Sequence, residues 1–364
     1  MNALHQLRSL GQRLWLDEIT RDLLDDGTLE RYVREFNVTG LTSNPTIFEN
    51  AIGGGKAYDA DIARHANIGK SGDAIFLDLA LADLRRAADL FRPEFDATGG
   101  VDGWVSLELS PLLAADTRGS IVAAERIHRE AGRANLFIKI PGTPEGERAI
   151  EECIFRGVPI NVTLLFSREQ YLAAAEAYMR GIERRLAAGR DPRVASVASL
   201  FVSRWDRAVA KSAPEDLRNR LGIAIAGRTY RAYRDLLASP RWQSLAGAGA
   251  MPQKLLWAST GTKDPQVSDT LYVEALAAPD TINTLPEKTL NAMAAHGRVG
   301  KVMDSQGGDA EEVLAQFAAA GIDVADLALQ LQREGAASFV NSWNGLLQRI
   351  ADKSVALGRP AKRA

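Results

Sequence analysis

Short apolar runs alternate along the chain with stretches of helical pattern, and this alternation limits the possible folds more than any other feature. Each run is bounded by turn residues and has the length of a buried strand. Regular strand–helix alternation indicates a parallel sheet, because a helix carries the chain back to the start of each new strand. Eight strands are expected, over 14–17, 40–44, 104–109, 136–140, 159–165, 196–202, 254–259 and 281–285.

Eight such units predict an α/β fold, a closed (β/α)8 TIM barrel. The competing architecture is an open, doubly wound sheet, but no G-x-G-x-x-G follows the first expected strand. Two connections, 49–103 and 204–253, exceed the length of one helix and predict extra helices there. We therefore expect a single barrel domain over 1–364. Its ends are predicted as an N-terminal helix in 1–13, helices over 308–350 that pack outside the barrel or cross its mouth, and a flexible tail over 353–364.

The charge balance and the rarity of cysteine exclude several classes of function. With 44 basic and 46 acidic residues, the chain gives no reason to expect nucleic acid or a membrane surface as partner. The single cysteine, Cys153, excludes an intramolecular disulfide and suits a reducing cytoplasm. The N-terminus is too polar for a signal peptide, and the four histidines are too far apart in sequence for metal-ligand spacing.

Lys139 lies near the end of the apolar run 136–143. Burial disfavours its ammonium form and so favours a neutral amine, the nucleophile that Schiff-base chemistry requires. Pro141 and Gly142 form a turn immediately afterwards, which places the amine at the C-terminal end of a strand. The alternative is a lysine whose stem reaches from the strand end to solvent.

Polar residues interrupt six of the eight expected strands at or near their C-terminal ends, where barrels of this kind carry their chemistry. Parallel strands buried on both faces usually have uninterrupted apolar sequences, and any single exception can be a satisfied buried polar group. Together, an amine, carboxylates, amides and hydroxyls at one mouth predict covalent carbonyl chemistry with acid–base assistance. The residues are Asp17, Asn44, Glu108, Lys139, Asn161 with Thr163, and Ser199.

Five of these segments carry a family resemblance: LDEITR (16–21), LTSNP (41–45), IKIPGT (138–143), INVTLLF (160–166) and SLFVSR (199–204). They resemble the transaldolase family, in the family's strand order, over about residues 10–290. The N-terminal half resembles the bacterial branch that also occurs fused to glucose-6-phosphate isomerase, although no isomerase portion stands in this sequence.

The resemblance implies a role for each polar residue. Lys139 would attack the C2 ketone of a ketose phosphate, and Asp17 would be the general base on the C4 hydroxyl. Glu108 and Thr163 would hold a water that carries protons during formation and hydrolysis of the Schiff base. The amides of Asn44 and Asn161 would bind the hydroxyls of the retained three-carbon fragment.

The resemblance also implies a phosphate site, with one departure. Ser199 and Arg204 would help to bind the phosphate, Arg204 through its fork of donors. The family commonly adds a second arginine after the seventh strand, but the segment ASTGTK (258–263) has none. Ser259 matches the family serine, and Lys263 either replaces the guanidinium as a point charge or is a solvated loop lysine.

The implied reaction moves a dihydroxyacetone unit from sedoheptulose 7-phosphate or fructose 6-phosphate to glyceraldehyde 3-phosphate or erythrose 4-phosphate. It belongs to the non-oxidative pentose phosphate pathway and needs neither a metal nor an organic cofactor. One alternative is a class I aldolase that releases free dihydroxyacetone, but Phe201 and Glu108 favour transfer over that reaction. Another is an inactive sugar-phosphate-binding barrel, which would have lost Lys139 or Asp17. A monomer and a homodimer are both compatible with the sequence.

Overall fold

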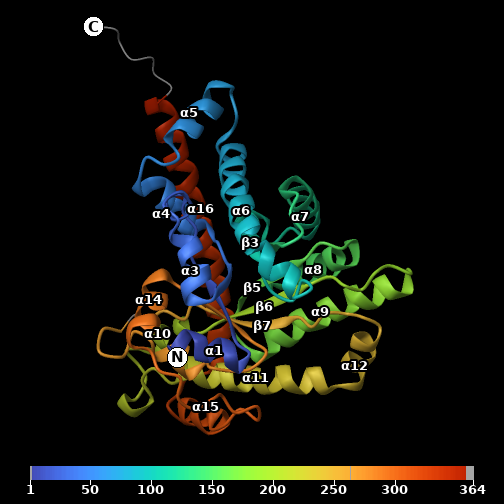
Figure 1. The fold of residues 1–364 in the computed structure, drawn as a ribbon. Coiled ribbons are helices and arrows are strands. Elements are labelled where there is room, and N and C mark those ends of the chain that lie inside the picture. Colours follow the sequence, from blue (N-terminus) through green and yellow to red (C-terminus); the bar gives the residue numbers. More distant parts are fainter. Residues whose placement is uncertain (1, 263, 358–364) are drawn as a thin grey trace.

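The computed structural model describes residues 2–262 and 264–357. Its strands form a closed barrel in which each strand pairs in parallel with its neighbours in sequence order, and the last pairs with the first. The predicted (β/α)8 barrel is confirmed (Figure 1). The strands are β1 (Arg13–Leu16), β2 (Val38–Leu41), β3 (Val105–Glu108), β4 (Leu136–Pro141), β5 (Ile160–Leu165), β6 (Ser196–Phe201), β7 (Lys254–Ala258) and β8 (Ile282–Leu285).

Strand register sets which polar residues are neighbours at the mouth. Glu108 at the end of β3 pairs with Lys139 of β4, and Lys139 in turn pairs with Asn161 of β5. Every residue of β2, β3, β5 and β6 is buried. Burial on both faces is what parallel strands under a layer of helices require, so polar side chains on these strands need internal partners or a cavity.

Helices follow the strands around the barrel. Several of these helices begin with capping residues near the mouth. For example, Ser167 and Gln170 form a capping box at the start of the helix after β5. Cys153 is buried in the helix after β4. These elements are α1 (Ala3–Leu10), α2 (Arg21–Asp25), α3 (Thr28–Phe36), the 3-10 turn η1 (Pro111–Leu113), α7 (Thr117–Ala131), α8 (Pro144–Arg156), α9 (Arg168–Ala187), α13 (Leu271–Ala275) and α14 (Glu287–His296).

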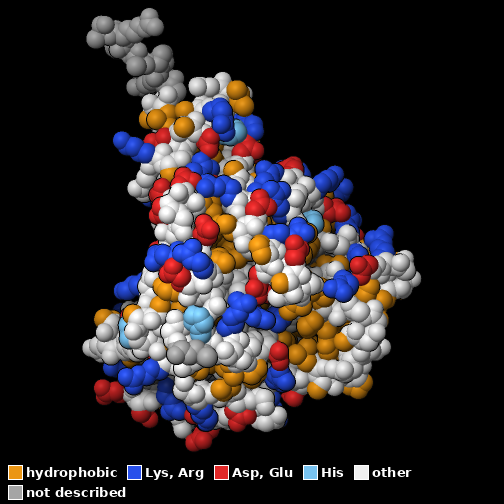
Figure 2. All heavy atoms as spheres, in the orientation of Figure 1, with side chains coloured by type: hydrophobic (Ala, Val, Ile, Leu, Met, Phe, Trp, Pro, Cys, Tyr) orange, Lys and Arg blue, Asp and Glu red, His pale blue; other side chains and the backbone are white. Residues whose placement is uncertain are grey.

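Extra helices occupy the two long connections, as predicted. The β2–β3 connection holds α4 (Pro45–Gly54), α5 (Asp59–Asn67) and α6 (Gly72–Ala97), and together with one end of α16 they project beyond the barrel (Figure 1). The β6–β7 connection holds α10 (Ser203–Val209), the 3-10 turn η2 (Glu215–Leu217), α11 (Leu221–Ala238) and α12 (Pro240–Gly247). On the face seen in Figure 2, basic and acidic side chains are interspersed over the barrel and the projection, in keeping with the near-neutral charge.

The last two helices are α15 (Ala310–Ala319) and α16 (Val324–Leu357). Of the two predicted placements, α16 has the second, because it crosses the mouth of the barrel. There the Gln332 amide donates to the carbonyls of Gly142 (2.8 Å) and Leu164 (3.1 Å). None of the helices in the described ranges is long and apolar enough to cross a membrane.

The C-terminal tail predicted from residue 353 needs a correction. Residues 353–357 are the last turn of α16, and the Lys353 ammonium donates to the carbonyl of Gly55 at 2.6 Å. The first residue of the predicted tail is thus a lysine that connects α16 to the loop between α4 and α5. Residues 358–364 of that prediction lie outside the described residues, as does Met1 of the predicted N-terminal helix.

Candidate active site

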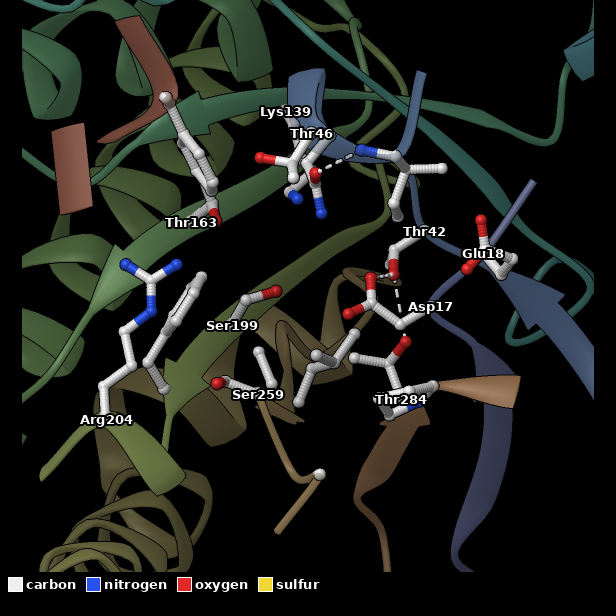
Figure 3. Close-up of a pocket in the computed structure, with 18 of the residues that line it drawn as sticks. Asp17, Glu18, Thr42, Thr46, Lys139, Thr163, Ser199, Arg204, Ser259 and Thr284 are labelled. Carbon is white, nitrogen blue, oxygen red and sulfur yellow. Dashed lines mark hydrogen bonds between the residues drawn. The ribbon is translucent and has the colours of Figure 1, made fainter. Parts of the chain in front are cut away.

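A cavity of about 280 Å³ opens at the C-terminal ends of the strands. This volume lies near the lower end of the roughly 300–1,000 Å³ that is usual for small-molecule sites. Figure 3 shows Arg204 on one side of the cavity, Asp17 and Glu18 on the other, and Lys139 and Thr163 between them. Seven of the ten predicted site residues line it: Asp17, Asn44, Lys139, Thr163, Ser199, Arg204 and Ser259.

Lys139 is buried, with 5% of its surface exposed. Its amine donates to the carbonyl of Ser43 at 3.1 Å and lies 3.1 Å from Oε2 of Glu108. The alternative of a lysine that reaches solvent is therefore wrong. The amine is held at the cavity wall by one carbonyl and one carboxylate.

Glu108 lies behind this amine and not on the cavity wall itself. Burial raises the pKa of the Glu108 carboxyl, and the charge of Lys139 partly offsets that shift. The negative charge of Asp17 raises the pKa further, while Arg204 lowers it. The result is a carboxyl with increased proton affinity in direct contact with the amine.

Thr163 brings an unpartnered hydroxyl to the cavity. It is fully buried on β5, next to Pro141 of β4 in register, and lines the cavity close to the strand that carries Lys139. Its Oγ1 has no hydrogen-bond partner within the described residues. Because buried hydroxyls are normally satisfied, this one is suited to hold a water or a substrate oxygen.

Asn161 lies beneath the cavity wall. Its carbonyl oxygen accepts from the Ser199 hydroxyl at 2.7 Å, and its amide donates to Ser106 Oγ at 3.1 Å. Ser199 lines the cavity and Asn161 does not. Asn161 therefore does not contact the cavity itself, but its hydrogen bond orients the Ser199 hydroxyl, which does.

Asn44 takes its position from the local sequence. It is the N-cap of α4, where its Oδ1 accepts from the Ile47 amide at 3.1 Å, and Pro45 occupies the first helical position. Both residue types are preferred at these places, so the helix starts a short loop after β2 and fixes the side chain at the mouth.

Two carboxylates lie on the side of the cavity opposite Arg204. Asp17 accepts from the Thr42 hydroxyl at 2.8 Å, and Thr42 in turn lies 2.9 Å from the hydroxyl of Thr284. Glu18 also lines the cavity. Burial, followed by the negative charges of Asp17 and Glu287, raises the pKa of Glu18 to about 7.

Arg204 faces these carboxylates from the start of α10. Its guanidinium carbon lies 4.9 Å from the ring centre of Phe201 and 5.7 Å from that of Phe339. Burial lowers the pKa of Arg204, and the charge of Glu108 opposes that shift. Ser259 lines the same cavity and lies 3.0 Å, hydroxyl to hydroxyl, from Ser203. Lys263, the predicted second cation, lies outside the described residues.

The family model described as Transaldolase/Fructose-6-phosphate aldolase matches residues 14–350. The chain belongs to this family. It is 44% identical over 363 residues to a transaldolase of Parafrankia sp. (strain EAN1pec), covering 96% of this chain and 97% of that relative. A transaldolase of Thermobifida fusca is 43% identical, with 98% and 99% covered, and one of Thiobacillus denitrificans is 43% identical, with 96% and 100% covered. The protein is thus an enzyme of the transaldolase type.

Several residues of this transaldolase-type site were not singled out from the sequence. Glu18 directly follows Asp17 at a strand end, and a second acid there was a usable signal. Phe339 comes from α16, far along the chain, and no local pattern connects it to the barrel mouth. Other missed residues of the cavity wall are Thr42, Thr46, Asn50 and Thr284.

Proposed function

We propose that the enzyme transfers a dihydroxyacetone unit between sugar phosphates through a Schiff base on Lys139. The donor would be fructose 6-phosphate or sedoheptulose 7-phosphate, and the acceptor erythrose 4-phosphate or glyceraldehyde 3-phosphate. One observation carries the proposal: the buried Lys139 amine, 3.1 Å from the Glu108 carboxylate, lies in a cavity between Asp17 and Arg204. The fold and family support the same reaction.

Formation of the Schiff base begins with a proton transfer. Glu108, with its raised pKa, accepts the proton of Lys139 and so frees the amine to attack the C2 carbonyl. The carbinolamine then loses its hydroxyl as water, with Glu108 as the acid. The unpartnered hydroxyl of Thr163 is placed to hold that water.

Carbon–carbon cleavage uses the opposite side of the cavity. Asp17 removes the proton of the C4 hydroxyl, the C4 carbonyl forms, and the electron pair of the C3–C4 bond moves to the iminium. The aldose phosphate leaves, and an enamine of dihydroxyacetone remains on Lys139. Attack of this enamine on the acceptor aldehyde reverses the steps, with Asp17 returning its proton to the new hydroxyl.

The remaining side chains would place the substrate. Arg204, with Ser259, would bind the phosphate through charge-assisted hydrogen bonds. Asn44 would bind hydroxyls of the three-carbon fragment. Asn161, expected from the sequence to bind them too, does not line the cavity and accepts from the Ser199 hydroxyl. We therefore assign Ser199 to that fragment, in place of the phosphate role expected from the sequence. We propose that Lys263 makes a second, weaker contact with the phosphate.

Transfer is favoured over simple aldol cleavage by two residues. Phe201, on the cavity wall, stands where family aldolases tend to have a tyrosine, and Glu108 is the third-strand glutamate that they tend to lack. We further propose that the enzyme works in the cytoplasm within the non-oxidative pentose phosphate pathway. It would be a monomer or homodimer that needs no cofactor, nucleic acid or membrane.

Borohydride trapping tests the Schiff base directly. The enzyme is incubated with fructose 6-phosphate, reduced, digested and mapped by mass spectrometry, and the three-carbon adduct is expected on Lys139. Lys254 is an internal control, because burial lowers its pKa but it begins β7 at the opposite end of the barrel. An adduct on Lys254, or none on Lys139, would overturn the assignment.

A further inference from the structure

The long helix α16 contributes Phe339 to the cavity wall and packs against the mouth with the face that carries it. Gln332, Gly335, Phe339 and Ser342 are spaced three and four residues apart, which places them on the same side of the helix. Gln332 bonds to two barrel carbonyls, and the Ser342 hydroxyl lies 2.8 Å from that of Thr46 in α4. The helix is therefore fastened to the mouth on both sides of Gly335 and Phe339.

Gly335 allows Arg204 to lie directly against this helix. A β carbon at residue 335 would come within 3.1 Å of Nη1 of Arg204 and within 2.9 Å of Cδ2 of Leu164. Contacts that short are not tolerated without movement of one partner. An alanine at 335 would therefore press on both the Leu164 methyl and the Arg204 guanidinium, and displace at least one of them.

Phe339 holds the other side of the same group. Its side chain is buried, with 4% exposed, and lines the cavity. The guanidinium carbon lies 5.7 Å from its ring centre and 4.9 Å from that of Phe201. Aromatic rings attract a guanidinium through their π faces and leave its N–H groups available.

The side chain of Arg204 makes no hydrogen bond or ion pair within the described ranges of the chain, and its contacts there are with aromatic rings. Its position is therefore set by ring contacts and by the close approach to Gly335. A guanidinium offers five N–H donors, and here they remain open toward an anion in the cavity. The Arg204 guanidinium is therefore preorganised to bind a phosphate.

We propose that Gly335 and Phe339 of α16 are positioning residues that hold Arg204 ready for the substrate phosphate. They make α16 a determinant of preference for phosphorylated over unphosphorylated donors. The inference rests on the proposed role of Arg204 in phosphate binding. It adds that a helix outside the eight βα units decides how well that arginine binds.

The test compares fructose 6-phosphate with unphosphorylated fructose as donors. Phe339→Leu keeps an apolar side chain and loses the ring, so KM for fructose 6-phosphate should rise roughly 3- to 10-fold, with kcat nearly constant. The kcat and KM for unphosphorylated fructose should each change less than about twofold. Phe339→Tyr restores a ring and should restore the KM, whereas Gly335→Ala should raise the KM as Phe339→Leu does.

Trp343 supplies the matched control. It is also a buried aromatic residue of α16, but it does not line the cavity. Its ring packs against that of Phe76 in α6, with 5.1 Å between the ring centres. Trp343→Leu should lower thermal stability without changing the preference between the two donors. A purely structural role of α16 would make Phe339→Leu behave like Trp343→Leu.

Two outcomes contradict the inference in distinguishable ways. If Arg204→Ala loses phosphate preference and Phe339→Leu does not, the positioning role of α16 is wrong and the phosphate site stands. If Arg204→Ala itself weakens both donors equally, the proposed phosphate role of Arg204 fails, and the inference fails with it.

Discussion

Lys139 and Glu108 occupy paired positions on neighbouring strands, and the amine of one lies 3.1 Å from the carboxylate of the other. Both side chains are buried, so water screens their interaction only weakly. A proton can pass between them without leaving a lone charge inside the protein. This contact connects strand register to the chemistry that we propose.

The first prediction concerns Glu108. Glu108→Gln keeps the shape of the side chain but cannot accept the proton of Lys139, so kcat should fall by roughly 10²- to 10⁴-fold. Steady-state rates with fructose 6-phosphate and erythrose 4-phosphate measure the loss, and rapid-quench trapping should show slow formation of the adduct. A fall of less than tenfold would remove Glu108 from the proton path.

The second prediction concerns Lys139. Lys139→Arg keeps a positive charge beside Glu108, but arginine stays protonated and cannot form an iminium. Turnover and borohydride trapping should both vanish, while circular dichroism verifies that the variant is folded. Retention of even about a tenth of the wild-type kcat is incompatible with the Schiff base on this residue, because the covalent step has no substitute.

The barrel and the position of Lys139 at its mouth were predictable because both depend on local patterns. Apolar runs and turn residues mark each strand, and in a parallel barrel all strand ends meet at one mouth. The meeting of Asp17, Lys139 and Thr163 in one cavity follows from that geometry.

Other features of the site depend on packing between distant segments. The approach of Phe339 to Arg204 depends on where α16 crosses the mouth, which helical periodicity does not specify. The position of Asn161 behind Ser199 depends on how far each side chain reaches past its strand. Lys353 looked like part of a basic tail because its partner, the carbonyl of Gly55, is almost 300 residues away in sequence.

The third prediction separates transfer from simple cleavage. With donor but no acceptor, a transferase should stop as the covalent three-carbon adduct, because no aldehyde is present to accept the unit. Adding erythrose 4-phosphate should restore turnover, followed as release of aldose phosphate over time. Free dihydroxyacetone accumulating without acceptor, at a rate comparable to transfer, would instead assign the enzyme to the aldolases.

The fourth prediction concerns phosphate recognition. Arg204→Ala should raise KM for fructose 6-phosphate roughly 10- to 100-fold, since a charge-assisted hydrogen bond contributes about 1.5–3 kcal/mol. Use of unphosphorylated fructose or dihydroxyacetone as donor should scarcely change. Lys263→Ala should show the same preference with a smaller effect if the lysine replaces the family's second arginine. A silent Lys263→Ala would instead make it a solvated loop lysine.

The last prediction concerns Glu18, whose pKa rises from 4.5 to about 7 in the folded protein. Between these values the folded state keeps a proton that the unfolded chain has released, so the contribution of Glu18 to stability falls as pH rises through this window. Above pH 7 the folded state carries an ionised carboxylate beside Asp17 and Glu287. Glu18→Gln removes this titration. Relative to wild type, the variant should therefore gain stability between pH 5 and pH 8.

We expect that relative gain to be on the order of 1 kcal/mol, less than the full shift implies, because Glu18 is partly exposed and solvent screens its interactions. Urea unfolding of both proteins at pH 5 and pH 8 measures it. Glu30→Gln, an exposed residue at the start of α3, controls for the removal of one negative charge. If the difference between Glu18→Gln and wild type is the same at both pH values, Glu18 does not titrate in this window, and burial and the charges of Asp17 and Glu287 do not raise its pKa.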